Sequence, residues 1–209
     1  ELMKHGCTTC FDHHYVFPAG AGDLIGAQFA ASDKIGARMY ASRGSMDLSV
    51  KDGGLPPDSV VQTVDEIMAD SARVIEKYHD KSFGAMHRVA LAPCSPFSVS
   101  ADLLRESAVL AREYGVRLHT HLCETKDEEH FMLASGVARV PEMLKLGVPV
   151  GLAVDGSASN DGSSLMEELR VAFLLHRLNS SKAAPSGYDV LKMATCGSAA
   201  ILGRSDDIG

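Results

Sequence analysis

The chain has 209 residues, of which 45% are hydrophobic and 22% charged, a composition that excludes disordered and fibrous classes and fits one large or two small globular domains. Its net charge of −7 and its lack of a Lys/Arg cluster argue against nucleic acid as a partner. The longest apolar stretches are shorter than the roughly 20 residues of a membrane span, and five scattered cysteines suit a reducing compartment, so we expect a cytoplasmic protein with no membrane partner.

Strand-like and helix-like segments alternate along the chain. Short apolar segments with polar ends predict strands at 6–12, 37–43, 88–94, 116–122 and 148–155. Apolar side chains recur every three or four residues over 60–78, 103–114, 165–173 and 190–202, which predicts helices there. This alternation favours a parallel sheet, because parallel strands need crossover connections and the helices then cover the sheet.

Polar and reactive side chains cluster where the predicted strands end. In a (β/α)₈ barrel these ends and the loops after them build the active site. A single strand-end His or Arg is more often a hydrogen-bonded structural residue, but the convergence of several favours function. The strand ends carry His13, His14, Tyr15, Arg43, Cys94, Ser95, His121, Glu124 and Asp155.

Two of these strand ends resemble half of a metal-hydrolase site. In 119–124 an imidazole, His121, precedes a carboxylate, Glu124, by three residues, and the apolar segment before Asp155 ends in a single carboxylate. Such a set supplies two metal ligands and a proton carrier, the minimum for activating water at neutral pH. The structural alternative for Asp155 is a cap of the turn that follows it.

The amino-acid sequences of several segments resemble those of the metal-dependent amidohydrolases, in particular the cytosine and guanine deaminase branch. They are most similar to bacterial 8-oxoguanine deaminases and to triazine hydrolases. The resemblance covers nearly the whole chain, and its specific parts are the HxxE string and the VDGSxSN string. The segments that carry it are 6–15, 43–46, 51–57, 91–98, 119–125 and 154–160.

The resemblance implies a role for each polar strand end. His121 would bind the metal ion, Glu124 would carry a proton to the substrate ring, and Asp155 would bind the metal and accept the proton of the attacking water. One divalent ion is implied, zinc first and iron as the alternative, since both suit imidazole and carboxylate ligands. His119 shares a strand face with His121, but the family's HxH string belongs to the first strand, so we interpret His119 as a deeper neighbour lining the barrel.

The implied activity is hydrolytic deamination of a purine-like nucleobase such as 8-oxoguanine or guanine, in which metal-bound hydroxide attacks a ring carbon and ammonia leaves. His14, Tyr15, Arg43 and Cys94 are the candidate substrate contacts from their location. Arg43 is as well explained by a structural ion pair. Two other functions stay open: a hydrolase of the same fold that removes a different leaving group, as from a triazine, and a non-catalytic fragment with structural histidines.

The predicted fold class is α/β, a (β/α)₈ TIM-type barrel present only in part. Five predicted strands in 209 residues fall short of the eight strands and about 250 residues of such a barrel. We therefore expect residues 1–209 to form a partial barrel, with a sequence gap near 130–135 and with terminal segments missing. A small flanking β domain and the family's remaining metal-binding histidines would lie in the complete protein, and a homo-oligomer is compatible with the sequence.

Overall fold

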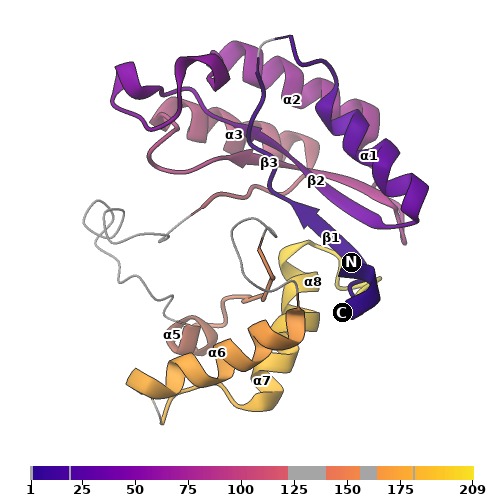
Figure 1. Cartoon of the computed structure of the whole chain (residues 1–209), viewed down its shortest axis with the longest axis vertical. Coiled ribbons are helices and arrows are strands. Elements are labelled where there is room, and N and C mark those ends of the chain that lie inside the picture. The colour runs from indigo at the N-terminus through magenta and orange to yellow at the C-terminus, as the bar shows by residue number, and fades with distance from the viewer. Residues whose placement is uncertain (1, 19, 122–139, 156–163, 181) are drawn as a thin grey trace. The chain divides into compact units, whose positions relative to one another are not determined.

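The computed structural model (Figure 1) describes residues 2–18, 20–121, 140–155, 164–180 and 182–209. The chain divides into two compact units. We call Thr8–Gly136 the sheet unit, and Glu1–Cys7 with Val137–Gly209 the helical unit. No described helix has the length and apolar character needed to cross a membrane.

The sheet unit contains three parallel strands in the order β1-β2-β3. The strands are β1 (Thr9–Asp12), β2 (Arg38–Ser45) and β3 (His87–Pro93). The helix α1 (Leu24–Ile35) connects the first pair and α2 (Val64–Tyr78) the second, while α3 (Ala101–Tyr114) follows β3. This is the parallel β-α arrangement that the alternation of the sequence predicts.

Local signals in the sequence set the ends of the helices. Thr63 and Glu66 form a capping box that starts α2, so the predicted helix 60–78 begins at Val64 instead. The 3₁₀ turns η2 (Val50–Asp52) and η3 (Asp58–Val60) lie before it. The helix α3 ends at Gly115, whose φ of 64° is the left-handed conformation that glycine adopts without strain.

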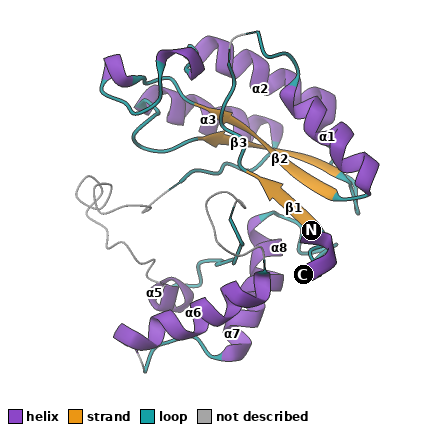
Figure 2. Cartoon of the chain, viewed as in Figure 1, coloured by secondary structure: helices purple, strands orange, loops and turns teal. Residues whose placement is uncertain are grey.

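Helices α1, α2 and α3 cover one face of the sheet (Figures 1 and 2). Side chains alternate along each strand, so one set enters this helical core and the next set points to the opposite face. Both sets are buried from Tyr40 to Ser45 in β2 and from Val89 to Pro93 in β3. Most of these residues are small or apolar, and Arg43 is the charged exception among them. The core contains Phe17, Ile25, Phe29, Ala41, Val74, Ile75, Val89, Leu91, Ala111 and Val116.

The strand predicted at 116–122 is present only as a single parallel bridge to β3 within residues 116–121. Leu118 forms a parallel bridge with Leu91, and the amides of His119 and His121 donate to the carbonyls of Leu91 and Cys94, both at 2.9 Å. Residue 122 lies outside the described residues. The chain therefore brings His121 beside the end of β3.

The helical unit contains only helices and loops among its described residues (Figure 2). Its core contains Val140, Ala172, Val190 and Met193. Its elements are η1 (Leu2–His5), α5 (Val140–Lys145), α6 (Leu165–Ser180), α7 (Gly187–Lys192), the π-helical turn η4 (Met193–Gly197) and α8 (Ser198–Ile201).

The prediction of a strand at 148–155 is wrong, because the structure has a loop there. Val150 and Leu152 pack against the core of the helical unit, as their apolar character requires. However, the amide of Leu152 donates to the carbonyl of Met193 at 3.3 Å, and the Ser198 hydroxyl donates to the Leu152 carbonyl at 3.2 Å. The segment thus bonds to helices, and a strand exists only where a neighbouring strand pairs with it.

Candidate metal centre

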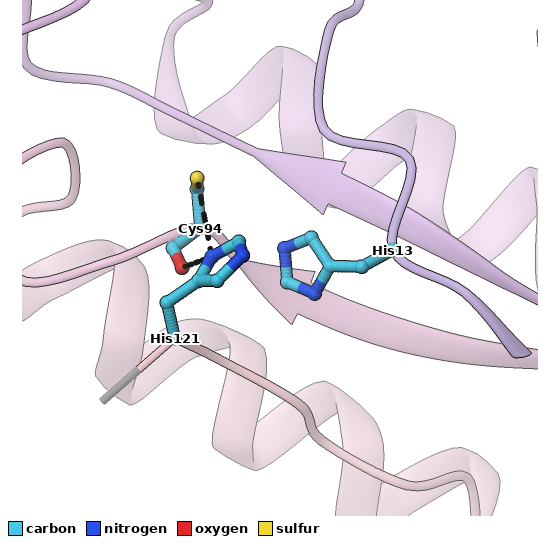
Figure 3. Close-up of side chains that lie close together, drawn as sticks. All are labelled: His13, Cys94 and His121. Carbon is cyan, nitrogen blue, oxygen red and sulfur yellow. Dashed lines mark hydrogen bonds between the residues drawn. The ribbon is translucent and has the colours of Figure 1, made fainter. Parts of the chain in front are cut away.

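Three side chains from separate segments meet at the carboxyl ends of the strands. His13 follows β1, Cys94 follows β3, and His121 ends the segment beside β3 (Figure 3). One possible ligand atom from each residue lies within 4.8 Å of the other two. We call these residues the metal cluster.

Strand alternation explains why His13 joins this cluster. The ring of Phe11 in β1 lies against His119, with the centroids 4.8 Å apart. Two residues further, the His13 ring lies on the same face, with its centroid 4.2 Å from that of His121. The sequence places His13 among the polar strand ends, but the residue predicted for the site is His14. Counting by two from Phe11 favours His13 instead.

The ring of His121 is oriented by Cys94. Its Nδ1 donates to the Cys94 backbone carbonyl at 2.8 Å and also lies 3.8 Å from the Cys94 sulfur (Figure 3). With its proton on Nδ1, the neutral imidazole carries a lone pair on Nε2. A backbone carbonyl commonly fixes metal-binding histidines in this tautomer, so the geometry suits His121 as a ligand.

His13 has two ring nitrogens that are buried and have no hydrogen-bond partner among the described residues. Burial, and then repulsion from the imidazoles of His119, His121 and His14, lowers the pKa of His13 from 6.5 to about 3. The ring is therefore neutral at physiological pH and offers a lone pair. Buried polar nitrogens without partners are rare in proteins, and a bound metal ion would satisfy one of these. The residues present fit a divalent ion.

Tyr15 lies beside the metal cluster, whereas His14 packs against another side chain. The Tyr15 ring is 5.9 Å from that of His121, and the residue is 41% exposed. The His14 ring contacts Phe17 at 4.9 Å edge to face, and its Nε2 is buried without a partner among the described residues. Tyr15 is thus the better placed of the two to touch a substrate at the cluster.

His119 lies beside the metal cluster, on the same strand face as His121, as its spacing of two residues predicts. Its ring lies against Phe11 and is 4.5 Å from the His13 ring. Its centroid is 6.5 Å from that of His121. This position agrees with the interpretation of His119 as a neighbour that lines the sheet.

Arg43 is held inside the protein by several partners. Its Nε donates to Asp70 at 2.7 Å, and its remaining nitrogens donate to the Gln62 side chain at 2.8 Å and to the Gly44 carbonyl. Its guanidinium also stacks over the Phe17 ring at 4.0 Å. Arg43 is only 1% exposed. Of the two roles that the sequence leaves open, this geometry favours the structural ion pair over a substrate contact.

Of the two carboxylates predicted for the site, the structure describes Asp155 but not Glu124. Asp155 belongs to the helical unit, is exposed, and has a φ of 61°. This left-handed conformation is uncommon for residues other than glycine, and Asp and Asn are among those that adopt it most readily. Glu124 lies outside the described residues.

Comparison with known proteins extends over the whole chain. Residues 1–134 and 127–209 match the amidohydrolase family. The chain is 40% identical to 8-oxoguanine deaminase of Pseudomonas aeruginosa, covering 99% of this chain and 58% of that protein. It is 35% identical to hydroxydechloroatrazine ethylaminohydrolase of a Pseudomonas species, strain ADP, covering 99% of this chain and 54% of that protein. The chain thus spans little more than half the length of these relatives.

Solved structures support the same relationship. Atrazine chlorohydrolase of Arthrobacter aurescens, in complex with zinc, matches with a TM-score of 0.86 and 30% identity, covering 98% of this chain and 58% of that one. A triazine hydrolase variant matches with a TM-score of 0.88 and 30% identity, covering 99% and 58%. With the parallel β-α units, this similarity confirms the predicted fold class, a part of a (β/α)₈ barrel. The chain belongs to the amidohydrolase family.

Proposed function

We propose that the protein is a metal-dependent hydrolytic deaminase of a purine-like nucleobase, with 8-oxoguanine as the first candidate and guanine as the second. The observation that carries this proposal is the metal cluster, in which two partly buried imidazoles and the Cys94 side chain converge at the carboxyl ends of parallel strands. Active sites of barrel enzymes lie at these ends. The 40% identity to a protein named 8-oxoguanine deaminase supports the choice of substrate.

The proposed chemistry replaces a ring amine by a carbonyl. A divalent ion, when bound, lowers the pKa of water towards 7 and so supplies the nucleophile. His121 would hold that ion through Nε2, because its Nδ1 donates to Cys94. Asp155 would contribute a further ligand oxygen and take the proton of the attacking water. Glu124 would pass a proton to the ring nitrogen, and the proton taken up by Asp155 would pass to the amine, which leaves as ammonia. The proton of the added hydroxyl would return to Glu124 as the carbonyl forms.

Zinc is the ion that we propose. Imidazole and carboxylate ligands suit zinc and iron alike, so these residue types do not separate the two metals. The matched chlorohydrolase structure is described as a zinc complex, which supports zinc for this chain.

For substrate contacts, we propose Tyr15 first, since its ring lies beside His121 and its side chain is partly exposed. Its hydroxyl can donate to or accept from a ring carbonyl or amine. His14 and Cys94 remain proposed contacts of lower rank, because the His14 ring packs on Phe17 and the Cys94 sulfur lies within the metal cluster. A Tyr15→Phe variant should raise KM with little change in bound metal.

The test of the proposed activity is ammonia release by the purified, zinc-loaded protein from 8-oxoguanine, guanine and cytosine. We expect the highest kcat/KM for 8-oxoguanine. Elemental analysis of the same sample checks whether metal is bound. A protein that binds no metal and releases no ammonia would support the non-catalytic alternative.

A second candidate function is removal of an alkylamine or a chloride from a triazine ring. It is favoured by the 35% identity to a protein named hydroxydechloroatrazine ethylaminohydrolase and by the match to a chlorohydrolase structure. Fold and metal site do not separate the two reactions, because pocket contacts choose the leaving group. Assays of alkylamine and chloride release from a triazine panel, run beside the ammonia assay, decide between them.

A further inference from the structure

We propose that the hydrogen bond between His79 and Val89, which we call the latch, is an acid-sensitive device that holds the end of α2 to the start of β3. His79 caps the C-terminal end of α2, and its Nδ1 accepts from the backbone amide of Val89 in β3 at 3.0 Å. The latch lies at the amino end of β3, whereas the metal cluster lies at the carboxyl ends of the strands. It is therefore independent of the proposed deaminase activity.

The hydrogen bonds along β3 explain why an acceptor is needed at this position. Amides of alternate residues in a strand point to the same side. The Leu91 amide donates to the Arg117 carbonyl at 2.9 Å, so the Val89 amide, two residues earlier, points to the same edge of β3. Val89 is fully buried, and a buried backbone amide requires a partner. The half-buried ring of His79 supplies this partner.

Only one protonation state of His79 can accept this hydrogen bond. The lone pair must lie on Nδ1, so the proton of the neutral ring lies on Nε2. The imidazolium has a proton on each nitrogen, and its Nδ1–H group would face the N–H group of Val89. Protonation of His79 therefore opens the latch and leaves the buried amide without its acceptor.

The surroundings of the ring oppose its charged form. Burial, and then the charges of Arg88 on β3 and Lys81 in the connection, lower the pKa of His79 below its usual 6.5. The neighbouring carboxylate of Asp80 acts in the opposite direction. Lys81 is fixed beside the ring, because its Nζ donates to the Tyr114 carbonyl at the end of α3 at 2.6 Å.

This lowered pKa gives the direction of the pH dependence. Below about pH 6.5 the opened or unfolded chain takes up a proton that the closed latch does not. The stability that the latch provides is thus complete above that pH and is lost progressively as the pH falls towards the folded value.

The nitrogen chemical shifts of the His79 ring, measured by NMR on the full wild-type chain, give the direct test. Near neutral pH we expect the shifts of a neutral ring with its proton on Nε2. On acidification, the His79 ring and the Val89 amide should titrate together. A proton on Nδ1 near neutral pH would overturn the proposal, because that tautomer cannot accept from Val89.

Amide hydrogen exchange of the same protein measures the opening of the latch. The Leu91 amide is the internal control, since a backbone carbonyl that does not titrate accepts its hydrogen bond. We expect the protection factor of the Val89 amide, relative to that of Leu91, to fall by about fivefold or more between about pH 7 and pH 5. An equal loss of protection at both amides would overturn the proposal.

Two variants separate the acceptor from its charge. In His79→Asn the side-chain oxygen takes the place of Nδ1 but does not titrate, so Val89 should keep its protection near neutral pH and lose the acid response. In His79→Ala the acceptor is missing, so protection should be about fivefold lower near neutral pH and no longer depend on acid. Persistence of the acid response in His79→Asn would overturn the proposal.

The matched control is His87→Asn, which removes another imidazole at the amino end of β3. The His87 Nε2 pairs with Asp33 at 2.6 Å and makes no part of the latch. We expect this variant to keep the acid response of the Val89 amide. Loss of that response would overturn the proposal, because the Asp33 pair would then be the titrating group. The nitrogen shifts are measured on the wild type and so decide the proposal even where a variant fails to fold.

Discussion

At the scale of single residues, burial explains what Arg43 does. Its guanidinium is enclosed by Asp70, Gln62 and Phe17, so removing it leaves a partly buried carboxylate with one partner fewer. We expect Arg43→Gln to lower the free energy of unfolding by about 3 kcal/mol. This value is the low end for a broken buried ion pair, because Arg73 still pairs with Asp70 in the variant. Urea denaturation measures this loss, and KM should stay unchanged.

The matched control for Arg43 is Arg105→Gln. Arg105 forms an ion pair with Asp102 on the exposed surface of α3 at 2.6 Å, and such a pair contributes about 0–1 kcal/mol. We expect this variant to unfold almost as the wild type does. An Arg43 variant with normal stability and a raised KM would restore the substrate-contact role that the sequence left open.

Proton transfer is the role proposed for Glu124. A variant without this carboxylate should therefore lose turnover but keep the bound metal. We expect Glu124→Gln to lower kcat by a factor of about 10² to 10⁴, the usual contribution of a general acid or base, with the metal content unchanged. Steady-state kinetics and elemental analysis of one sample measure both quantities. Glu113→Gln, an exposed position of α3, is the control. Loss of the metal from Glu124→Gln would reclassify Glu124 as a ligand.

At the scale of elements, Gly44 in β2 lets the segment after β1 approach the sheet. A Cβ at this position would lie 2.2 Å from the His14 carbonyl oxygen and 2.4 Å from the Tyr15 Cα, both backbone atoms. We expect Gly44→Ala to displace this segment, to cost about 1–3 kcal/mol of stability and to weaken zinc binding, since His13 is carried along. Thermal unfolding and zinc titration measure the two effects.

The control for Gly44 is Gly187→Ala in α7. There a Cβ would meet nothing closer than the Phe173 ring at 4.0 Å, so stability and zinc affinity should hardly change. If Gly44→Ala bound zinc as tightly as the wild type, the position of the segment after β1 would not matter for the metal cluster.

The contact between α1 and α2 depends on the charge of Asp23. Asp23 caps α1 through Gly26, accepts from the Tyr78 hydroxyl at 2.5 Å, and pairs with Lys77 at 3.0 Å. Burial alone would raise the pKa of Asp23, but hydrogen bonds from Tyr78, Lys77 and Gly26, with the charge of Arg73, lower it far below its usual 3.8.

This shift predicts how stability depends on pH. A carboxylate with a lowered folded pKa stabilises the protein above its unfolded pKa, and this contribution is lost as the pH falls towards the folded value. Asn caps helices as well as Asp, so Asp23→Asn removes the charge of the residue but keeps the cap. We expect this variant to lower the free energy of unfolding by about 0.5–1 kcal/mol at neutral pH. The difference in this free energy between variant and wild type should shrink between about pH 5 and pH 2. Denaturation curves at several pH values measure it. A constant difference across this range would contradict the charged role of Asp23.

The elements show which features the sequence could predict. Helix α2 was predictable because its apolar period and its capping box at Thr63 are local signals. The segment 148–155 was not, since a strand requires a pairing partner and this sequence is apolar enough to pack on helices as well. His14 was chosen over His13 for a related reason: a shift of one residue in the assumed strand phase exchanges the two side chains. Local chemistry was predictable, and pairing between distant segments was not.

At the scale of the whole molecule, the proposed roles of His121 and Asp155 differ. His121 is a ligand of the metal cluster, whereas Asp155 is proposed both to bind the ion and to accept the proton of the attacking water. Metal retention and turnover should therefore respond differently to a change at Asp155. Its φ of 61° makes Asn the suitable substitution, because Asn tolerates this conformation and an Ala variant would add backbone strain to the loss of the carboxylate. We expect Asp155→Asn to lower kcat by about 10² to 10⁴ through the missing proton acceptor, and to retain part of the bound metal because the Asn Oδ1 still offers a ligand oxygen. His121→Ala should instead lose both metal and turnover, because it removes a ligand of the metal cluster. If Asp155→Asn lost the metal as completely as His121→Ala, the negative charge of Asp155 would be needed to hold the ion.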